Sequence, residues 1–180
     1  IDLAARAFRF VEENMIRDGR LHHAWREGKL QHLAMAADLA FMADAALALH
    51  EATFAPRYLD AAQSFIGQLD SHYADATNGG YFFTADDAPG LIVRTRTVYD
   101  DAIPSANGVL PGILTRLAFL TGDDSYLAKA GTDKSKLLTA NVWLKDINDF
   151  AAFNAAWSEW SDKENLPVRA TVEAKLADPK

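Results

Sequence analysis

The sequence predicts a mainly α-helical fold that ends in a small βαβ unit. Apolar residues recur at helical spacing in several segments of residues 1–130, and loops containing glycine and proline separate these segments. Helices that alternate with long loops indicate an array of α/α hairpins. Residues 131–180 instead show strand, amphipathic helix and strand in succession. We therefore expect two partial modules, a helical one over residues 1–130 and a βαβ one over residues 131–180.

Composition and charge narrow the classes of function. With 180 residues, 49% of them hydrophobic, the chain is long enough to bury a core in one domain or two small ones. A formal net charge of -7 provides no basic face for a polyanion, so we expect no nucleic-acid partner. The absence of cysteine excludes disulfides and thiolate chemistry, and it leaves carboxylates, His, Arg, Ser and Tyr as candidate functional groups.

The sequence contains no membrane span. No stretch approaches the roughly 18 consecutive apolar residues that a span requires, because the most apolar stretch, residues 33–49, contains Asp38 and Asp44. The chain also begins without a methionine or a basic segment followed by an apolar core. We therefore expect a soluble, cytoplasmic piece of something longer, with no membrane partner and no bound cofactor.

Three helices are predicted in the first part of the chain. Residues 1–16 carry apolar side chains mostly at helical spacing, whereas residues 17–29, RDGRLHHAWREGK, predict a connecting loop or a short extended pair. Residues 30–51 are rich in alanine and apolar almost all round, which predicts an inner and deeply buried helix. Pro56 fits the first turn of a third, amphipathic helix, because its missing N–H costs nothing there.

A long loop and another helix follow. Residues 74–106 contain several glycines and the short β-prone runs YFFT and LIVRT, so we expect an ordered loop with a small hairpin. Ser105 or Asn107 can cap the next helix through a side-chain oxygen. That helix runs to Thr121, with leucine and isoleucine on one face.

The last part of the chain has a different pattern. Residues 138–144 alternate as a strand, and residues 168–176 form a second strand. Between them, Asp146 or Asn148 can cap a helix that extends through Trp160. This order of elements predicts a βαβ unit.

Three segments of residues 30–130 resemble the later part of the YyaL-like family: DLAFMADAALALHEAT, YADATNGGYFFTADDAPGLIVRTRTVYDDAIPSANGVL and LTRLAFLTGDDSYLAKA. Proteins of that family join a thioredoxin-like domain to an (α/α)6 toroid of the six-hairpin glycosidase type. The resemblance covers a little over half of the chain and implies a partial toroid, because a complete one needs more residues. It implies a carbohydrate-active or carbohydrate-binding fragment without the thioredoxin-like module.

The resemblance also implies a candidate site. The family pattern D-x-A-x-P-S-G-N-S is matched by residues 100–108, DDAIPSANG, with two exchanges of small residues. Carboxylates at the mouth of such a toroid can act as general acid and base on a glycosidic bond. The candidate catalytic carboxylates are Asp38, Asp100 and Asp101, and the candidate substrate-binding residues are Tyr81, Arg94, Ser105 and Asn107. The alternative is structural: Asp100, Ser105 and Asn107 can tie the loop to the helix N-terminus through backbone hydrogen bonds.

Residues 131–180 resemble the RidA (YjgF) family, through GTDKSKLLTANVWLKDINDFAAFNAAWSEW and LPVRATVEAKLADP. RidA proteins are small trimeric enzymes that hydrolyse reactive enamines and imines to keto acids. The family motif P-A-R-x-x-V-E appears at residues 167–173 with Val168 in place of alanine, which implies that Arg169 binds the substrate carboxylate as a catalytic-site residue. The family's early strands and last strand are missing, and its complete site lies between subunits. The alternative is that Arg169 is an ordinary solvated charge.

Two further patterns have structural explanations. His22, His23 and His32 lack the H-x-x-x-H or H-E-x-x-H spacing of metal ligands, so no metal site is predicted. Trp157 and Trp160, at positions i and i+3, pack more simply against the sheet of their own module than in a sugar-stacking platform.

Three functional hypotheses follow, and they leave open whether the chain is an enzyme. The main one is a carbohydrate-active or carbohydrate-binding fragment that takes a sugar or another small molecule. The second is RidA-like hydrolysis through Arg169. The third is a noncatalytic helical module that self-associates through apolar helix faces left exposed by missing repeats. Residues 1–130 hold nine Arg and two Lys, whereas residues 131–180 hold one Arg and six Lys, which indicates that two unrelated partial modules are joined. A natural fusion, a gene-prediction artefact and an assembled environmental sequence would each give this pattern.

Overall fold

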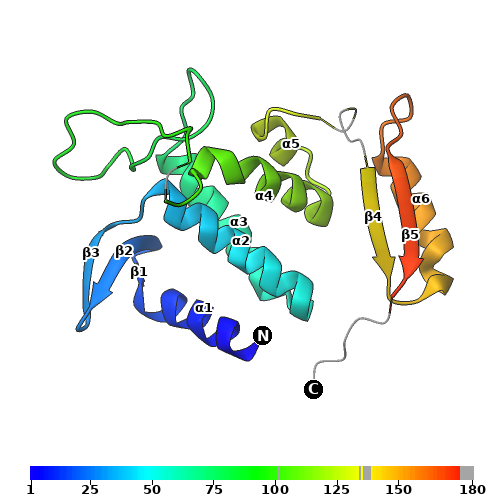
Figure 1. Ribbon diagram of the computed structural model, residues 1–180, viewed down its shortest axis with the longest axis horizontal. Helices are drawn as coiled ribbons and strands as arrows, with labels where there is room; N and C mark the ends of the chain where they lie inside the picture. Colours follow the sequence, from blue (N-terminus) through cyan, green and yellow to red (C-terminus); the bar gives the residue numbers. More distant parts are fainter. Residues whose placement is uncertain (101, 134, 136–138, 175–180) are drawn as a thin grey trace.

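The computed structural model describes residues 1–100, 102–133, 135 and 139–174, and it shows a mixed α/β fold (Figure 1). Helices α1 to α5 and a three-stranded sheet form the N-terminal part, and a two-stranded parallel sheet with α6 forms the C-terminal part. The predicted fold class, a mainly α partial (α/α)6 toroid, is therefore wrong. In the described residues the N-terminal helices form one cluster with an antiparallel sheet beside it, and not a ring of helix hairpins.

A three-stranded antiparallel sheet occupies residues that we assigned to a loop or a short extended pair and to the start of a helix. It follows α1 (Asp2–Asn14) and consists of β1 (Ile16–Arg17), β2 (Arg20–Arg26) and β3 (Lys29–Leu33). The two-residue turns Asp18-Gly19 and Glu27-Gly28 join the strands, and all four turn residues have positive φ. Type I′ hairpin turns need positive φ at both central residues. Pairing with β2 therefore places residues 30–33 in a strand, and the predicted helix begins later.

Helix α2 is the inner helix of the N-terminal part, as the sequence predicts. The helices that follow the sheet are α2 (Ala36–Thr53), α3 (Pro56–His72), α4 (Ala106–Thr121) and α5 (Ser125–Lys129). Helix α2 packs against α3 and α4, since apolar side chains surround it on several sides. Its fully buried residues include Ala40, Ala43, Ala46 and Leu47. The predicted starts of the next helices are confirmed, because Pro56 opens α3 and Ser105 is the N-cap of α4.

Side-chain hydrogen bonds, and not the predicted hairpin, organise the long segment between α3 and α4. The described residues of this segment form one isolated β-bridge, between Ala74 and Tyr81. The buried Asp75 holds the turn that follows the bridge. Its carboxylate accepts the backbone N–H of Asn78 at 3.0 Å and the side-chain amide of Asn78 at 3.1 Å, and Arg96 Nη1 donates to it at 3.2 Å.

The Asp75 carboxylate makes the stability of the folded chain depend on pH in the acid range. The hydrogen bonds from Asn78 and the neighbouring Arg96 lower the pKa of Asp75 in the folded chain. The stabilisation is therefore complete above the unfolded-state pKa of about 3.9 and is lost as pH falls through the lower folded-state pKa. We predict that Asp75→Asn is less stable than the native chain at pH 6 and that the difference shrinks toward pH 3. Urea unfolding across this range measures it.

A second carboxylate provides the control for that experiment. Asp60 is exposed on α3, so Asp60→Asn changes the net charge by the same amount without touching the turn. Urea midpoints of Asp60→Asn should follow those of the native chain at each pH. If the free energies of unfolding of Asp75→Asn and the native chain differed by the same amount from pH 6 to pH 3, the predicted effect of the Asp75 pKa on stability would be wrong.

The C-terminal part is a βαβ unit, as the sequence predicts. Strands β4 (Thr139–Leu144) and β5 (Val168–Glu173) pair in parallel, from Thr139 opposite Val168 to Leu144 opposite Glu173. The crossover contains a 3-10 turn, η2 (Ile147–Asp149), followed by α6 (Phe150–Trp160). The Asp146 carboxylate caps this turn by accepting the Asn148 N–H at 2.9 Å. Helix α6 lies along one face of the strand pair (Figure 1).

The buried apolar core lies in the N-terminal part. It extends from Phe8 to Leu127, and in the C-terminal part Val142 and Trp157 are buried. The division into domains at residues 1–130 and 131–180 stays a prediction. None of the helices in the described part of the chain combines the length and the apolar character needed to cross a membrane.

Candidate functional site

The motif at residues 100–108 ties a loop to the start of α4. Asp100 Oδ1 accepts the Ser105 N–H at 2.9 Å, and Ser105 Oγ accepts the Gly108 N–H at 3.0 Å. An N-cap hydroxyl in this position satisfies an N–H that has no partner within the helix. These contacts agree with the structural alternative for Asp100 and Ser105. Asp101, the third candidate carboxylate, lies outside the described residues.

Asn107 fastens the same loop to the segment around Tyr81. Asn107 Oδ1 accepts the Tyr81 N–H at 2.8 Å, and Asn107 Nδ2 donates to the carbonyl oxygens of Tyr81 and Thr97, each at 2.9 Å. Gly80 makes this close approach feasible, because a Cβ there would lie 2.8 Å from Asn107 Oδ1. The φ of +74° at Gly80 also favours glycine. The side-chain amide of Asn107 is thus used to hold backbone.

Two other candidate substrate-binding side chains also have partners within the chain. The Tyr81 hydroxyl donates to Asp70 Oδ1 at 2.7 Å, and burial raises the pKa of Tyr81, which the Asp70 carboxylate raises further. Arg94 donates to the carbonyl oxygens of His72 at 2.6 Å and Thr84 at 2.9 Å. Arg94 therefore links the long loop to the end of α3.

Asp38 lies in the first turn of α2. Its Oδ2 accepts the Met35 N–H at 2.7 Å and lies 2.7 Å from His23 Nδ1, so it caps the helix and contacts the small sheet. Within the described residues, no hydrogen bond joins Asp38 to Asp100. A catalytic role for these carboxylates, and substrate binding by Tyr81, Arg94, Ser105 and Asn107, stay predictions.

A histidine and two aspartates meet at the end of α3. His72 Nδ1 lies 3.0 Å from Asp86 Oδ1 and 3.9 Å from Asp87 Oδ2. Arg20 donates two hydrogen bonds to Asp87, at 2.5 and 3.0 Å, and its Nη1 lies 3.2 Å from His72 Nε2. These hydrogen bonds lower the pKa of Asp87. Because a guanidinium cation already contacts two of the three groups, we interpret the cluster as a structural ion-pair network.

Arg169 lies on β5 and contacts α6. Its Nη2 donates to Asn154 Oδ1 at 2.6 Å, and its guanidinium carbon lies 5.2 Å from the ring centroids of Phe153 and Trp157. Contacts of this kind are cation–π interactions, and they help to orient the guanidinium. The other terminal nitrogen, Nη1, is buried and has no hydrogen-bond partner among the described residues. A buried donor without an acceptor is costly, so Nη1 of Arg169 has hydrogen-bonding capacity that the described residues do not use.

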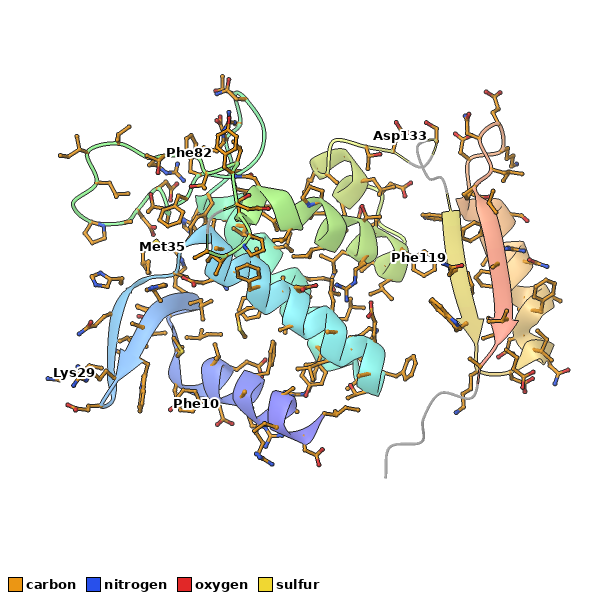
Figure 2. All side chains as sticks on the ribbon, in the orientation of Figure 1. Phe10, Lys29, Met35, Phe82, Phe119 and Asp133 are labelled. Carbon is orange, nitrogen blue, oxygen red and sulfur yellow. The ribbon has the colours of Figure 1, made fainter. Side chains whose placement is uncertain are left out.

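An aromatic cleft lies between the two parts of the chain. It has a volume of about 490 Å³, and α4, the end of α2, β4 and α6 contribute side chains to it. We define the aromatic cleft by its ring-bearing residues, Phe54, Phe119, Trp143, Trp157 and Trp160. Phe119 and Trp160 pack edge to face with ring centroids 6.1 Å apart. Figure 2 shows Phe119 at the end of α4 that faces β4.

Sequence reasoning did not find the aromatic cleft. It placed Trp157 and Trp160 beside the sheet of the C-terminal part, and Trp157 does pack there. The approach of Phe54 and Phe119 to β4 depends on how the two parts meet, which residue periodicity does not encode. The ion-pair network around His72 was missed for a similar reason, since Arg20 and Asp87 are 67 residues apart.

The C-terminal part is thus a small α/β module in which a partly buried arginine lies between strand and helix. The family model described as endoribonuclease L-PSP matches residues 117–180. The RutC family protein YoaB of Escherichia coli (strain K12) is 49% identical over 90 residues, which cover 50% of this chain and 78% of YoaB. The chain belongs to the RutC family.

Other relatives match a smaller share of their length. A RutC family protein of Haemophilus influenzae is 57% identical over 56 residues, which are 31% of this chain and 48% of that protein. The crystal structure of NMB1025, a member of the YjgF protein family from Neisseria meningitidis, is 34% identical and has a TM-score of 0.30, over 41% of this chain and 56% of that chain. The chain therefore spans about half the length of these two relatives.

These comparisons correct part of the sequence interpretation. They support the resemblance of the C-terminal residues to the RidA (YjgF) family, and they give no support to the resemblance of residues 30–130 to the YyaL-like family. The assignments to a glycosidase-like toroid and to a thioredoxin-domain protein are wrong, since the fold contains two sheets and the family is RutC. Short matching segments indicated a family whose fold these residues do not adopt.

Proposed function

We propose that the chain carries the carboxylate-binding part of a RidA-like site for reactive imines and enamines of 2-keto acids. The observation that carries the proposal is the buried, unpartnered Nη1 of Arg169 within the matched family motif. In the reaction, water adds to the imine carbon, the carbon–nitrogen bond breaks, and a keto acid and ammonia leave. The guanidinium of Arg169 would hold the substrate carboxylate during these steps.

The surroundings of Arg169 support this role. Asn154 holds Nη2, and the rings of Phe153 and Trp157 limit the orientations that the guanidinium can adopt. A carboxylate would supply an acceptor for Nη1 and a countercharge in a half-buried position. Lysine would keep the charge but could not offer two parallel N–H groups.

The proposal extends to partners and location. A small carboxylate-bearing molecule is the proposed ligand, and the net charge of -7 favours it over nucleic acid even though the matched family model is described as a ribonuclease. We propose a cytoplasmic location. Self-association through exposed apolar helix faces stays a prediction.

Turnover of an imine tests the proposal directly. The imine of a 2-keto acid is formed in solution from an amino acid by an amino acid oxidase, and its hydrolysis by the full chain is followed as release of the keto acid. We predict that Arg169→Lys lowers kcat/KM by about tenfold or more, because one charge-assisted hydrogen bond is lost. Arg169→Ala should lower it further.

Arg26→Lys is the matched control, since the Arg26 side chain is exposed and lies on the small sheet of the N-terminal part. This variant should hydrolyse the imine as fast as the native chain. Far-UV circular dichroism of all variants separates a loss of activity from a loss of fold. Native turnover by the folded Arg169→Ala chain would rule out the proposed role.

A further inference from the structure

A cavity lies between the three-stranded sheet and the long segment that joins α3 to α4. It has a volume of about 420 Å³, which is within the range of small-molecule sites. Strands β2 and β3, the connection to α2 and residues 84–91 contribute to its wall, and Figure 2 shows Met35 in that connection. We call this cavity the histidine cavity and define it by six of its lining residues, His22, His32, Leu33, Met35, Ala85 and Leu91.

Two imidazoles are the polar side-chain groups that a ligand would meet in the histidine cavity. The described lining residues include three with polar side chains, His22, His32 and Thr84. The hydroxyl oxygen of Thr84 is buried and therefore out of reach. None of the described lining residues is Asp, Glu, Lys or Arg. The cavity thus has an apolar wall with a small number of polar groups, which is typical of sites for small organic molecules.

His22 presents a hydrogen-bond acceptor to the cavity. Its Nδ1 lies 3.2 Å from the backbone carbonyl oxygen of Arg20. Because a carbonyl oxygen can only accept a hydrogen bond, Nδ1 carries the ring proton and donates it. The other nitrogen of the neutral imidazole, Nε2, then has a free lone pair. Among the described residues the His22 ring makes no second hydrogen bond, so Nε2 can accept one from a ligand.

The backbone of His32 departs from the strand conformation. His32 has a φ of +54° although it lies within β3. Non-glycine residues with positive φ are uncommon and strained, and such residues cluster at binding and catalytic sites. Alternation along a strand would direct His32 and Leu33 to opposite faces, yet both line the histidine cavity. Since Leu33 is the strand partner of His22, the second imidazole lies close to the first along the hairpin.

We infer that the histidine cavity binds a small neutral hydroxyl compound with an apolar body, such as an alkylphenol. The hydroxyl would donate to His22 Nε2 and accept from the ring N–H of His32, since a hydroxyl group is both donor and acceptor. The apolar body would contact Leu33, Ala85 and Leu91 and lose its contact with water. This inference does not involve Arg169 and does not depend on the proposed function.

The charges around the histidine cavity disfavour ionic ligands. A carboxylate has no donor for the lone pair of His22 Nε2, and the net charge of -7 repels it. The guanidinium of Arg20 is already paired with Asp87 at 3.0 Å. An ammonium ion would find no carboxylate among the described lining residues, and a buried charge without a partner is costly. A sugar would leave many of its hydroxyl groups against an apolar wall.

Three probes test the inference on the native chain. They are para-propylphenol, para-propylanisole, which keeps the oxygen but has no donor, and para-propylbenzoate, which is an anion. Binding to the full chain is measured by NMR through the ring signals of His22 and His32, at about pH 8, where histidine is ordinarily neutral. We expect the anisole to bind at least about fivefold more weakly than the phenol, because it cannot donate to Nε2. The benzoate should bind at least about tenfold more weakly, because it adds a negative charge.

Two histidine variants test the position of the acceptor. His22→Ala should weaken binding of the phenol at least about fivefold and leave less than about a twofold preference for the phenol over the anisole. His50→Ala is the matched control. His50 also contacts a backbone carbonyl through Nδ1, that of Ala55 at 3.1 Å, but it lies at the far end of α2. This variant should bind the phenol as the native chain does, and circular dichroism checks that each variant is folded.

Four results would overturn the inference. The phenol does not bind at millimolar concentration, or the anisole or the benzoate binds as tightly as the phenol. A folded His22→Ala chain keeps the native affinity and the native preference for the phenol. The phenol shifts the signals of Trp143 and Phe119 in place of those of His22 and His32, which would assign it to the aromatic cleft.

Discussion

Leu47→Ala lowers the free energy of unfolding by about 2–5 kcal/mol, the range for removing a fully buried leucine from a core. Leu47 lies on α2, the helix that packs against both α3 and α4, and its side chain is inaccessible to solvent. The smaller alanine side chain loses apolar burial and leaves a cavity that closely packed helices only partly close. Urea unfolding followed by far-UV circular dichroism measures the change.

Leu3→Ala is the matched control for this substitution. Leu3 lies on α1 and is 73% exposed, so the same chemical change removes little buried surface. Its free energy of unfolding should stay within about 0.5 kcal/mol of the native value. Equal losses for the two variants would mean that α2 is not the centre of the core.

Urea unfolding of Leu47→Ala also tests whether residues 1–130 and 131–180 are separate domains. Trp143, Trp157 and Trp160 lie in the C-terminal part, and Trp25 in the N-terminal part, so all the tryptophans of a Trp25→Phe background lie in the βαβ unit. If residues 1–130 and 131–180 are separate modules, Leu47→Ala shifts the circular dichroism transition and leaves the fluorescence transition unchanged. Coincident shifts would mean that the chain unfolds as one cooperative unit.

Local signals in the sequence predicted several elements well. Pro56 and Ser105 mark the starts of α3 and α4, because each acts on the backbone within its own first turn. The βαβ unit was predicted from alternation and a capping residue, which are also local. For residues 17–29 the sequence left a loop and a short extended pair as alternatives, and the structure has the extended pair, continued by a third strand. The turn pairs Asp18-Gly19 and Glu27-Gly28 match type I′ hairpins, but the dense charge around them was interpreted as a loop or a short extended pair.

The partners of the candidate site residues could not be predicted from the sequence. The motif at residues 100–108 stands out in the sequence as a set of polar groups, but the partners of these groups are set by the fold. Asn107 contacts Tyr81, which is 26 residues away, and Arg94 reaches the end of α3, 22 residues away. In the same way, the motif identified Arg169, whereas the unpartnered nitrogen and the contact with Asn154 depend on the packing of α6. The spacing of residues in the sequence does not distinguish a side chain that holds a loop in place from one that binds a ligand.

Asn107→Asp separates these two roles and should destabilise the folded chain by about 2–4 kcal/mol. The substitution keeps the shape of the side chain, and one carboxylate oxygen can still accept the Tyr81 N–H. The other oxygen replaces Nδ2, which donates to the carbonyl oxygens of Tyr81 and Thr97. Two hydrogen bonds are therefore lost, and a negative charge is placed against two carbonyl oxygens.

The prediction is specific because Asn107→Asp should loosen one segment of the chain more than the rest. Without the Asn107 amide, residues 81 and 97 are no longer held together, so limited proteolysis should cut the segment between α3 and α4 faster. Ile92→Asp provides a control for the added charge within the same segment, because Ile92 is fully exposed. Asn107→Ser should give an intermediate loss, since a hydroxyl can keep one hydrogen bond at most. If Asn107→Asp were as stable and as resistant to proteolysis as the native chain, the Asn107 side chain would not be needed to hold the loop against α4. That result would favour a ligand-binding role for its amide.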